Sequence, residues 1–310
     1  MINHYNAPMQ KSHPIGRFAP SPTGPLHFGS LLAAVGSWLQ ARSRDGQWLL
    51  RIEDLDPPRV MVGADSAILR SLEAFGLYWD GAVVYQSARQ EAYQAALEQL
   101  IDAGAAYGCL CTRKQIQARG RPGPAGVIYP GTCRAGLSPG KSARSWRVDS
   151  RGARIAFEDA IQGPQQADLE AEIGDFAIRR ADGLFAYHLA LVVDDAASGV
   201  TEVVRGQDLL ACTPPQIHLQ HLLGLPSPEY AHLPLAMNRH GTKLSKQTFA
   251  KALDDADPGP QLAQALGFLG HPPPAGLHGA PVAELLDWAR NTWSLERIPR
   301  LAGMLSPTGE

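Results

Sequence analysis

The sequence predicts an α/β fold: a parallel sheet covered by helices, interrupted by an insertion and followed by a short helical segment. Strand-like and helix-like segments alternate over residues 14–105 and again over 183–248, which is typical of parallel strands joined by helices. Between them, over 106–182, the periodicity weakens and Gly, Pro, Cys and Arg become frequent. We therefore expect two halves of one sheet domain around an α/β insertion, with a flexible tail over 1–13 and a helical segment over 249–310.

The first half of the sheet is predicted from segments that alternate in order. Residues 15–21, IGRFAPS, have the pattern of a strand that runs into a turn. Residues 29–42 carry apolar side chains at helical spacing, with Ser30 in the place of an N-cap. A second strand and two amphipathic helices, each closed near a glycine, are expected next, over 46–56, 59–76 and 88–104.

The second half begins with two apolar runs that have the character of buried strands, LFAYHLALVVDD over 184–195 and GVTEVVRGQDLL over 199–210. Residues 213–224, TPPQIHLQHLLG, predict a helix with proline in its first turn. Only 63 residues follow Gln247, and their pattern is mostly helical. The sheet is therefore expected to resume after the insertion and to be capped by a few helices.

The charge of the chain is unevenly distributed. The whole chain carries a net charge of -2, but residues 113–154 contain ten basic residues and one acid, so this window carries +9 and the rest carries -11. A solvated surface loop is one explanation of such a run. Contact with a phosphate backbone is the other, because so one-sided a stretch in a slightly acidic protein is what nucleic-acid binding requires. The charge pattern alone favours the two explanations about equally.

Two separate motifs have the chemistry of a nucleotide site. His27 lies in the turn between the first strand and the first helix, where ligands of open parallel sheets bind, and Gly29 would let a flat base approach the backbone. Lys243 and Lys246 flank a serine in the glycine-led segment GTKLSKQ, which suits a polyphosphate leaving group. Each motif alone has an ordinary explanation, a histidine that caps a helix and a solvated surface turn.

Together the two motifs resemble the signatures of class I aminoacyl-tRNA synthetases: PLHFGS is similar to the HIGH signature and KLSKQ to the KMSKS signature. The surrounding segments look like the glutamyl-tRNA synthetase catalytic core, in order, from residue 16 to about 247: RFAPSPTGPLHFGSL, LLRIEDLD, FAYHLALVVDD, VVRGQDLL and TPPQIHLQHLLG. The resemblance implies a Rossmann-like catalytic domain that joins glutamate to ATP, with Mg²⁺ shielding the phosphates. It implies catalytic roles for His27, Lys243 and Lys246, and contacts to ATP from His27, Gly29 and Lys246.

A glutamate pocket is expected on grounds of charge as well as by resemblance. Glutamate brings two carboxylates and an ammonium, and Arg17 and Arg205 offer guanidinium forks for carboxylates, while Glu53 can hold the ammonium. The alternative to a pocket is that the strand-end Arg and Glu residues form surface ion pairs and that Tyr187 belongs to the core. The family pattern implies that the amino acid is contacted by Arg17, Phe18, Ala19, Pro20, Ser21, Glu53, Tyr187 and Arg205.

Three clustered cysteines lie inside the insertion, Cys109, Cys111 and Cys133, with Tyr129 between the last two. Such a cluster in a cytoplasmic protein favours zinc over a disulfide, but the spacing alone makes zinc and free thiols equally good explanations. Cys212, at a strand–helix junction, is expected to be an ordinary buried thiol.

The chain also resembles one particular family of glutamyl-tRNA synthetase relatives, the glutamyl-Q tRNA(Asp) synthetases. The 63 residues after the lysine segment are too few for an anticodon-reading region. The family carries this set of three cysteines and a tyrosine as ligands of one structural zinc ion. The resemblance implies activation of L-glutamate without tRNA, then transfer to the queuosine base of tRNA(Asp), with the basic insertion holding the RNA.

Three alternatives remain at this point. A truncated glutamyl-tRNA synthetase that charges the 3′ end of tRNA(Glu) would share nearly every residue named above. A nucleotidylyltransferase of another kind would not need the glutamate pocket, and a silent zinc-dependent RNA-binding module would not need His27 and Lys246. Hydrophobic content of 45% and the lack of a signal-like or membrane-spanning stretch lead us to expect a cytoplasmic monomer without a membrane partner.

Overall fold

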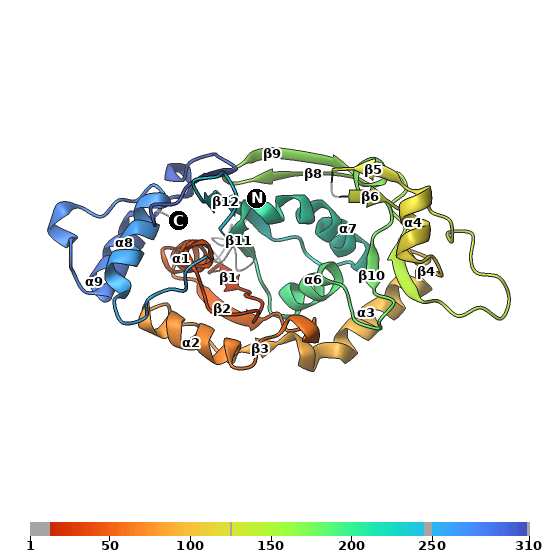
Figure 1. Cartoon of the computed structure of the whole chain (residues 1–310), viewed down its shortest axis with the longest axis horizontal. Coiled ribbons are helices and arrows are strands. Elements are labelled where there is room, and N and C mark those ends of the chain that lie inside the picture. The colour runs from red at the N-terminus through yellow and green to blue at the C-terminus, as the bar shows by residue number, and fades with distance from the viewer. Residues whose placement is uncertain (1–12, 125, 245–249, 309–310) are drawn as a thin grey trace, which may run out of the picture.

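The structure is a computed structural model, and it describes residues 13–124, 126–244 and 250–308 (Figure 1). Three parallel strands form the first part of the sheet: β1 (Ile15–Phe18), β2 (Gln47–Ile52) and β3 (Val84–Tyr85), in the order β1-β2-β3. They alternate with the helices α1 (Phe28–Arg42), α2 (Ala64–Ala74) and α3 (Gln90–Asp102). This strand–helix alternation confirms the fold class expected from the sequence.

The second part of the sheet has the order β11-β12-β8-β9. Its strands are β11 (Glu202–Gly206), β12 (Glu229–Leu233), β8 (Arg154–Asp159) and β9 (Gly163–Asp168). Strands β11 and β12 are parallel, and α7 (Thr213–Leu223) connects them. The two parts meet at β1 and β11, where the N–H of Thr201 donates to the carbonyl oxygen of Ile15 at 2.9 Å. The carboxyl ends of β1, β2 and β11 therefore share one edge, where open α/β sheets bind ligands.

The apolar run over 184–195 was expected to be a strand, and this prediction is wrong. Most of the run belongs to helix α6 (Tyr187–Ala197). Six residues of this helix are buried, including both aspartates that end the run, so its apolar side chains do not follow the one-sided period of a surface helix. A short apolar run without that period cannot be distinguished from a buried strand.

The first helix also begins differently from the prediction. His27 is the N-cap of α1, and Ser30 is the third helical residue rather than the cap. The Ser30 hydroxyl accepts a hydrogen bond from the His27 N–H at 2.7 Å, so serine still satisfies an N–H at the start of the helix. Helix α1 packs into the centre of the largest core, where Leu31, Val35 and Leu39 are fully buried.

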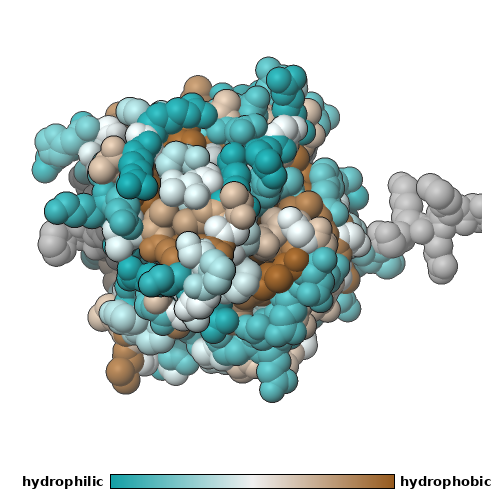
Figure 2. Space-filling view, turned by 90° about the vertical axis from the view of Figure 1, so that its right-hand side faces the viewer, coloured by the Kyte–Doolittle hydropathy of each residue, from teal (hydrophilic) through white to brown (hydrophobic). Residues whose placement is uncertain are grey.

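The cysteine-containing segment forms a separate small layer at one end of the molecule, on the right in Figure 1. An antiparallel sheet in the order β10-β7-β4 joins β4 (Ala106–Cys109), β7 (Ser145–Val148) and β10 (Ala177–Arg179). Helix α4 (Arg113–Arg119) and the hairpin β5 (Arg121–Gly123) and β6 (Gly126–Ile128) lie beside it, and α5 (Leu169–Glu172) follows β9. Figure 2 shows this end, with hydrophilic side chains around a more apolar centre.

The C-terminal segment is mainly helical, as expected. Helices α8 (Pro258–Phe268) and α9 (Val282–Thr292) pack against α1. Strand β14 (Gly303–Leu305) pairs in parallel with β13 (Leu235–Met237). Among the helices of the described residues, none combines the length and the apolar character that a membrane span requires.

Candidate active site

A cavity of about 650 Å³ opens at the carboxyl ends of β1, β2 and β11. Its lining brings together eleven residues that the sequence analysis singled out from distant parts of the chain. They are Arg17, Phe18, Ala19, Pro20, Ser21, His27, Gly29, Glu53, Tyr187, Arg205 and Lys243. Lys246, the twelfth, lies outside the described residues. The grouping itself is a property of the fold, whereas the role of each residue stays a prediction.

Arg17 ends β1 as a buried cation held from one side. Its Nε donates to both carboxylate oxygens of Asp195 on α6, at 3.2 and 3.3 Å, and Arg51 Nη1 donates to the same carboxylate at 2.7 Å. Burial alone would raise the pKa of Asp195, but the two guanidinium groups outweigh burial and hold that pKa below its usual value. Asp195 is therefore an ionised anchor that fixes Arg17 through Nε, and among the described residues no hydrogen-bond partner of the Arg17 Nη groups is found.

Glu53 and Asp208 are the carboxyl groups among the described residues of the lining. Glu53 follows β2, its side chain is 9% exposed, and Arg51 Nη2 donates to it at 3.3 Å. Burial raises the pKa of Glu53, although the charges of Arg51 and Arg17 oppose that shift. A buried carboxylate in this condition gains from a further positive partner, so Glu53 suits a ligand ammonium.

Arg205, at the end of β11, is a buried guanidinium whose partners are uncharged. The side chains and carbonyl that accept from it are His232 Nε2 at 3.0 Å, Thr213 Oγ1 and Gln216 Oε1 at 2.8 Å, the Leu209 oxygen at 3.3 Å and Tyr187 Oη at 3.5 Å. Within the described ranges, no carboxylate lies within 4.0 Å of its nitrogens. Nη1 makes only the long contact to Tyr187, so the cavity presents an uncompensated positive charge to an anion.

His232 and Asp159 extend this arrangement behind Arg205, and the sequence analysis missed both. Because His232 Nε2 accepts from Arg205, the ring must carry its proton on Nδ1, which donates to Asp159 Oδ2 at 2.5 Å. Burial lowers the pKa of His232 and so favours the neutral ring, which the hydrogen bonds from Arg205 and to Asp159 require. No local sequence signal identifies His232, because it comes to lie opposite Arg205 only through the parallel register of β11 and β12.

His27 and Lys243 also line the cavity. His27 caps α1, and Gly29 lies so close that a Cβ there would come within 3.1 Å of the imidazole. Lys243 Nζ contacts Asp208 Oδ2 at 2.5 Å, with both side chains partly exposed. A phosphate group at this position would find the N-terminus of α1, an imidazole and an ammonium.

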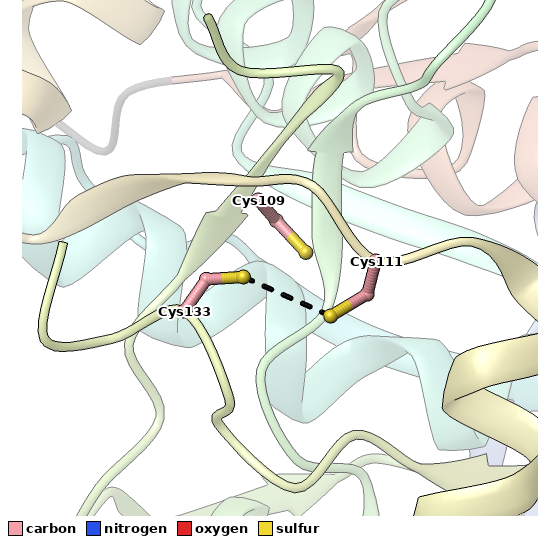
Figure 3. Close-up of side chains that lie close together, drawn as sticks. All are labelled: Cys109, Cys111 and Cys133. Atoms are coloured by element: carbon pink, nitrogen blue, oxygen red, sulfur yellow. Dashed lines mark hydrogen bonds between the residues drawn. The ribbon is translucent and has the colours of Figure 1, made fainter. Parts of the chain in front are cut away.

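The three cysteines of the insertion converge on one point (Figure 3). The sulfur atoms of Cys111 and Cys133 are 3.7 Å apart, which matches the edge of a tetrahedron with zinc–sulfur bonds, about 3.8 Å. Tyr129 Oη lies 3.4 Å from Cys109 Sγ and 3.5 Å from Cys111 Sγ, against about 3.5 Å for an oxygen and a sulfur on one zinc ion. These four side chains therefore fit a tetrahedral zinc site. Cys212, expected to be buried, is half-buried at the start of α7.

This fold and cavity define the catalytic domain of a class I tRNA synthetase. The chain belongs to that family: its residues 15–127 and 134–273 match the model of "tRNA synthetases class I (E and Q), catalytic domain". A solved glutamate tRNA ligase from Elizabethkingia meningosepticum, in complex with its amino acid, has the same fold, with a TM-score of 0.78 and 24% identity over 96% of this chain and 68% of that chain.

Within the class, this chain is a member of the glutamyl-Q tRNA(Asp) synthetases, and it is a ligase. The protein of that name from Aromatoleum aromaticum is 56% identical over 286 residues, 92% of this chain and 90% of the relative. The one from Thiobacillus denitrificans is 57% identical over 285 residues, 92% of this chain and 95% of the relative.

Proposed function

We propose that the protein joins L-glutamate to ATP as glutamyl-adenylate without needing tRNA, and then transfers the glutamyl group to the queuosine base in the anticodon loop of tRNA(Asp). The observation that carries the first step is the charge pattern of the cavity. Arg17 and Arg205 are buried cations of the lining, and Glu53 is a carboxyl group of the same lining whose side chain is 9% exposed. The names of the relatives support the second step.

The amino-acid end of the cavity matches the three charged groups of glutamate. Arg205 has a spare donor face and no carboxylate partner among the described residues, so the side-chain carboxylate of glutamate would supply the missing negative charge. Glu53 would hold the ammonium. The fork of Arg17, oriented by Asp195, would bind a carboxylate and help to hold the substrate.

The phosphate end of the cavity suits the adenylation step. One oxygen of the α-carboxylate attacks the α-phosphorus of ATP, the bond to pyrophosphate breaks, and glutamyl-adenylate and pyrophosphate result. His27 at the start of α1 would stabilise the charge that develops on the α-phosphate, and Lys243 would exchange Asp208 for the leaving pyrophosphate. The family resemblance extends this role to Lys246.

The transfer step needs only a hydroxyl near the adenylate. A hydroxyl of the queuosine diol attacks the carbonyl carbon, the bond from that carbon to the adenylate oxygen breaks, and AMP leaves while the hydroxyl proton passes to solvent. The cavity opens at the edge of the sheet, so a nucleotide of an RNA loop can approach it. The protein's task in this step is to hold the two reacting groups in line.

Two metal ions belong to the proposal. Mg²⁺ would bind with ATP and neutralise its phosphates, and Asp208 is the carboxylate of the lining that is accessible to it. One zinc ion would be held by Cys109, Cys111, Tyr129 and Cys133, where it would cross-link β4 to the segment that follows β6. Zinc in this position is structural, because all four ligand positions come from the protein.

The test is transfer of radiolabelled glutamate, with ATP and Mg²⁺, to three RNAs: tRNA(Asp) that carries queuosine, its unmodified transcript, and tRNA(Glu). We expect label on the queuosine-containing tRNA(Asp) alone. Label on both forms of tRNA(Asp), or on tRNA(Glu) alone, would contradict the proposed acceptor. The second result would identify the alternative, a truncated glutamyl-tRNA synthetase.

The activation step is tested separately by ATP–pyrophosphate exchange with glutamate and no RNA. We expect exchange in the wild-type protein. We expect its loss in Lys246→Ala, because that variant lacks the lysine ammonium that would stabilise the leaving pyrophosphate. Exchange that depends on added tRNA would contradict activation without tRNA. Absence of exchange under every condition would favour a silent RNA-binding module.

A further inference from the structure

A second cavity, of about 920 Å³, lies beside α4 and the β10-β7-β4 sheet, at the end of the molecule that Figure 2 shows. We call it the arginine groove. Its charged lining consists of four arginines and two aspartates: Arg113, Arg144, Arg147, Arg180, Asp56 and Asp182. The groove also includes Cys111, so one of its walls is the proposed zinc site.

The positive charge of the groove is only partly used inside the protein. Arg180 pairs with Asp182 at 2.6 Å, and Arg147 donates to the carbonyl oxygen of Asp175 at 2.7 Å while its guanidinium lies 4.1 Å from the centre of the Tyr129 ring. Arg113 and Arg144 are exposed, and neither forms an ion pair with any residue that the structure describes. The groove thus keeps two free guanidinium groups beside two that are fixed.

The other basic residues of 113–154 are also of two kinds, those with a partner inside the protein and those without an acidic partner. Several of the arginines are bound to acids or carbonyl groups nearby, as Arg134 is to Asp175 at 2.5 and 2.8 Å. Others have no acidic partner in the described part of the chain, and they lie on α4 or on the segment before β7, as Arg113 and Arg144 do: Lys114, Arg119 and Lys141. The elements that carry the unpaired cations of the groove therefore carry further unpaired cations.

An ion triad connects the lining of the groove to the lining of the catalytic cavity. Asp56 Oδ2 lies 3.6 Å from Arg180 Nη1 and 3.9 Å from Arg59 Nη1. Arg180 and Asp56 line the groove, whereas Arg59 lines the catalytic cavity. A polymer bound in the groove can therefore continue past this ion triad into the cavity.

We propose that the arginine groove binds the sugar–phosphate backbone of the RNA beside the nucleotide that enters the catalytic cavity, with Arg113 and Arg144 as its main phosphate contacts. This inference rests on the proposed function, since it assumes an RNA substrate. Guanidinium forks bind phosphates in a bidentate manner, and arginines spread along a groove suit the repeated charges of a backbone better than one compact anion. Arg147 and Arg180, which are already fixed, would shape the path.

The test compares two double variants with the same change in net charge. Arg113→Ala/Arg144→Ala removes the free groove cations, and Arg70→Ala/Arg300→Ala removes two exposed arginines outside both cavities. Binding of fluorescently labelled, queuosine-containing tRNA(Asp) is measured by anisotropy over a series of salt concentrations. We expect the groove variant to bind at least tenfold more weakly, with the slope of log K against log salt reduced by about 1.4, or about 0.7 per single-stranded phosphate contact.

The control variant should bind like the wild type, and both variants should keep wild-type ATP–pyrophosphate exchange because neither changes the catalytic cavity. Equal affinity and equal slope in the two double variants would overturn the groove proposal, as would a wild-type protein that binds this RNA without salt dependence. Failure of the proposed function looks different: the wild type would bind the RNA with the expected groove dependence and yet transfer no glutamate to it.

Discussion

Replacing Tyr129 by phenylalanine tests whether the phenol is the fourth zinc ligand. The substitution removes one oxygen atom and keeps the ring. The guanidinium carbon of Arg147 lies over this ring, 4.1 Å from its centre. In the structure that oxygen accepts a hydrogen bond from the Cys133 N–H at 3.0 Å and lies within 3.5 Å of two cysteine sulfurs. Tyr129→Phe therefore removes a ligand and one ordinary hydrogen bond, and the two effects have to be separated.

The expected size of each effect follows from its chemistry. Loss of a residue that only orients a ligand weakens metal binding about 10- to 100-fold, so loss of a ligand should raise the zinc dissociation constant by at least about 100-fold. At a fixed zinc concentration, a 100-fold weaker site gives up about 2.7 kcal/mol of the free energy of unfolding that zinc contributes. Loss of the hydrogen bond costs about 1 kcal/mol whether or not zinc is present.

The assay is a competition titration against a chromogenic chelator, together with urea unfolding in the presence and absence of zinc. The matched control is Tyr107→Phe, which removes the hydroxyl that donates to Asp175 beside the same cluster. We expect the control to keep wild-type zinc affinity. A Tyr129→Phe protein with wild-type affinity and one bound zinc ion would refute the assignment of the phenol as a ligand.

Three further predictions concern the glutamate end of the cavity. Arg205→Lys keeps the charge but not the fork, so loss of a charge-assisted hydrogen bond of about 1.5 to 3 kcal/mol should raise the KM for glutamate about 10- to 150-fold with little change in the KM for ATP; parallel changes in both would contradict a specific role. Because the pKa of Glu53 is raised and the carboxylate must be ionised to hold an ammonium, the KM for glutamate should fall as pH rises above about 4.5, and a similar profile in Glu53→Gln would disprove the assignment. Asp195→Asn leaves two buried guanidinium groups without their shared charge, so urea unfolding should show a loss of about 3 to 5 kcal/mol, and a loss below about 1 kcal/mol would count against the anchor. Since the pKa of Asp195 is lowered in the folded state, its stabilising effect is complete above the unfolded value of about 3.9 and disappears as pH falls through the folded value, so the variant should lose less stability in acid than the wild type.

The sequence was sufficient to predict residues whose chemistry is tied to a place in the chain. Arg17 and Glu53 each follow a recognisable strand, and His27 stands before a recognisable helix, so the rule that ligands bind at the carboxyl edge of a parallel sheet was enough to group them. The closeness of the three cysteines was predictable because they lie within 25 residues of one another, whereas their zinc ligation stays a prediction.

The residues that the sequence analysis missed are those whose roles depend on pairing between distant segments. Arg51 donates to Asp195, which lies 144 residues further along the chain, and nothing local to either residue indicates this contact. His232 has a role only because the register of β11 and β12 sets it opposite Arg205. The helix over Tyr187–Ala197 was missed because burial on several sides removes the periodicity that would identify it.

The hydrogen-bonded chain from Asp159 through His232 to Arg205 has a consequence for how this enzyme can be rebuilt. Asp159 ends β8, which lies in the chain between β7 and β10 of the cysteine-containing layer, and its carboxylate supports the arginine that we assign to the amino acid. A graft that exchanged the whole region between β3 and α6 with that of a relative would also exchange one support of the amino-acid pocket. A graft that stops between β7 and β8 would exchange the segment with the four proposed zinc ligands, keep Asp159 and leave the support of Arg205 in place.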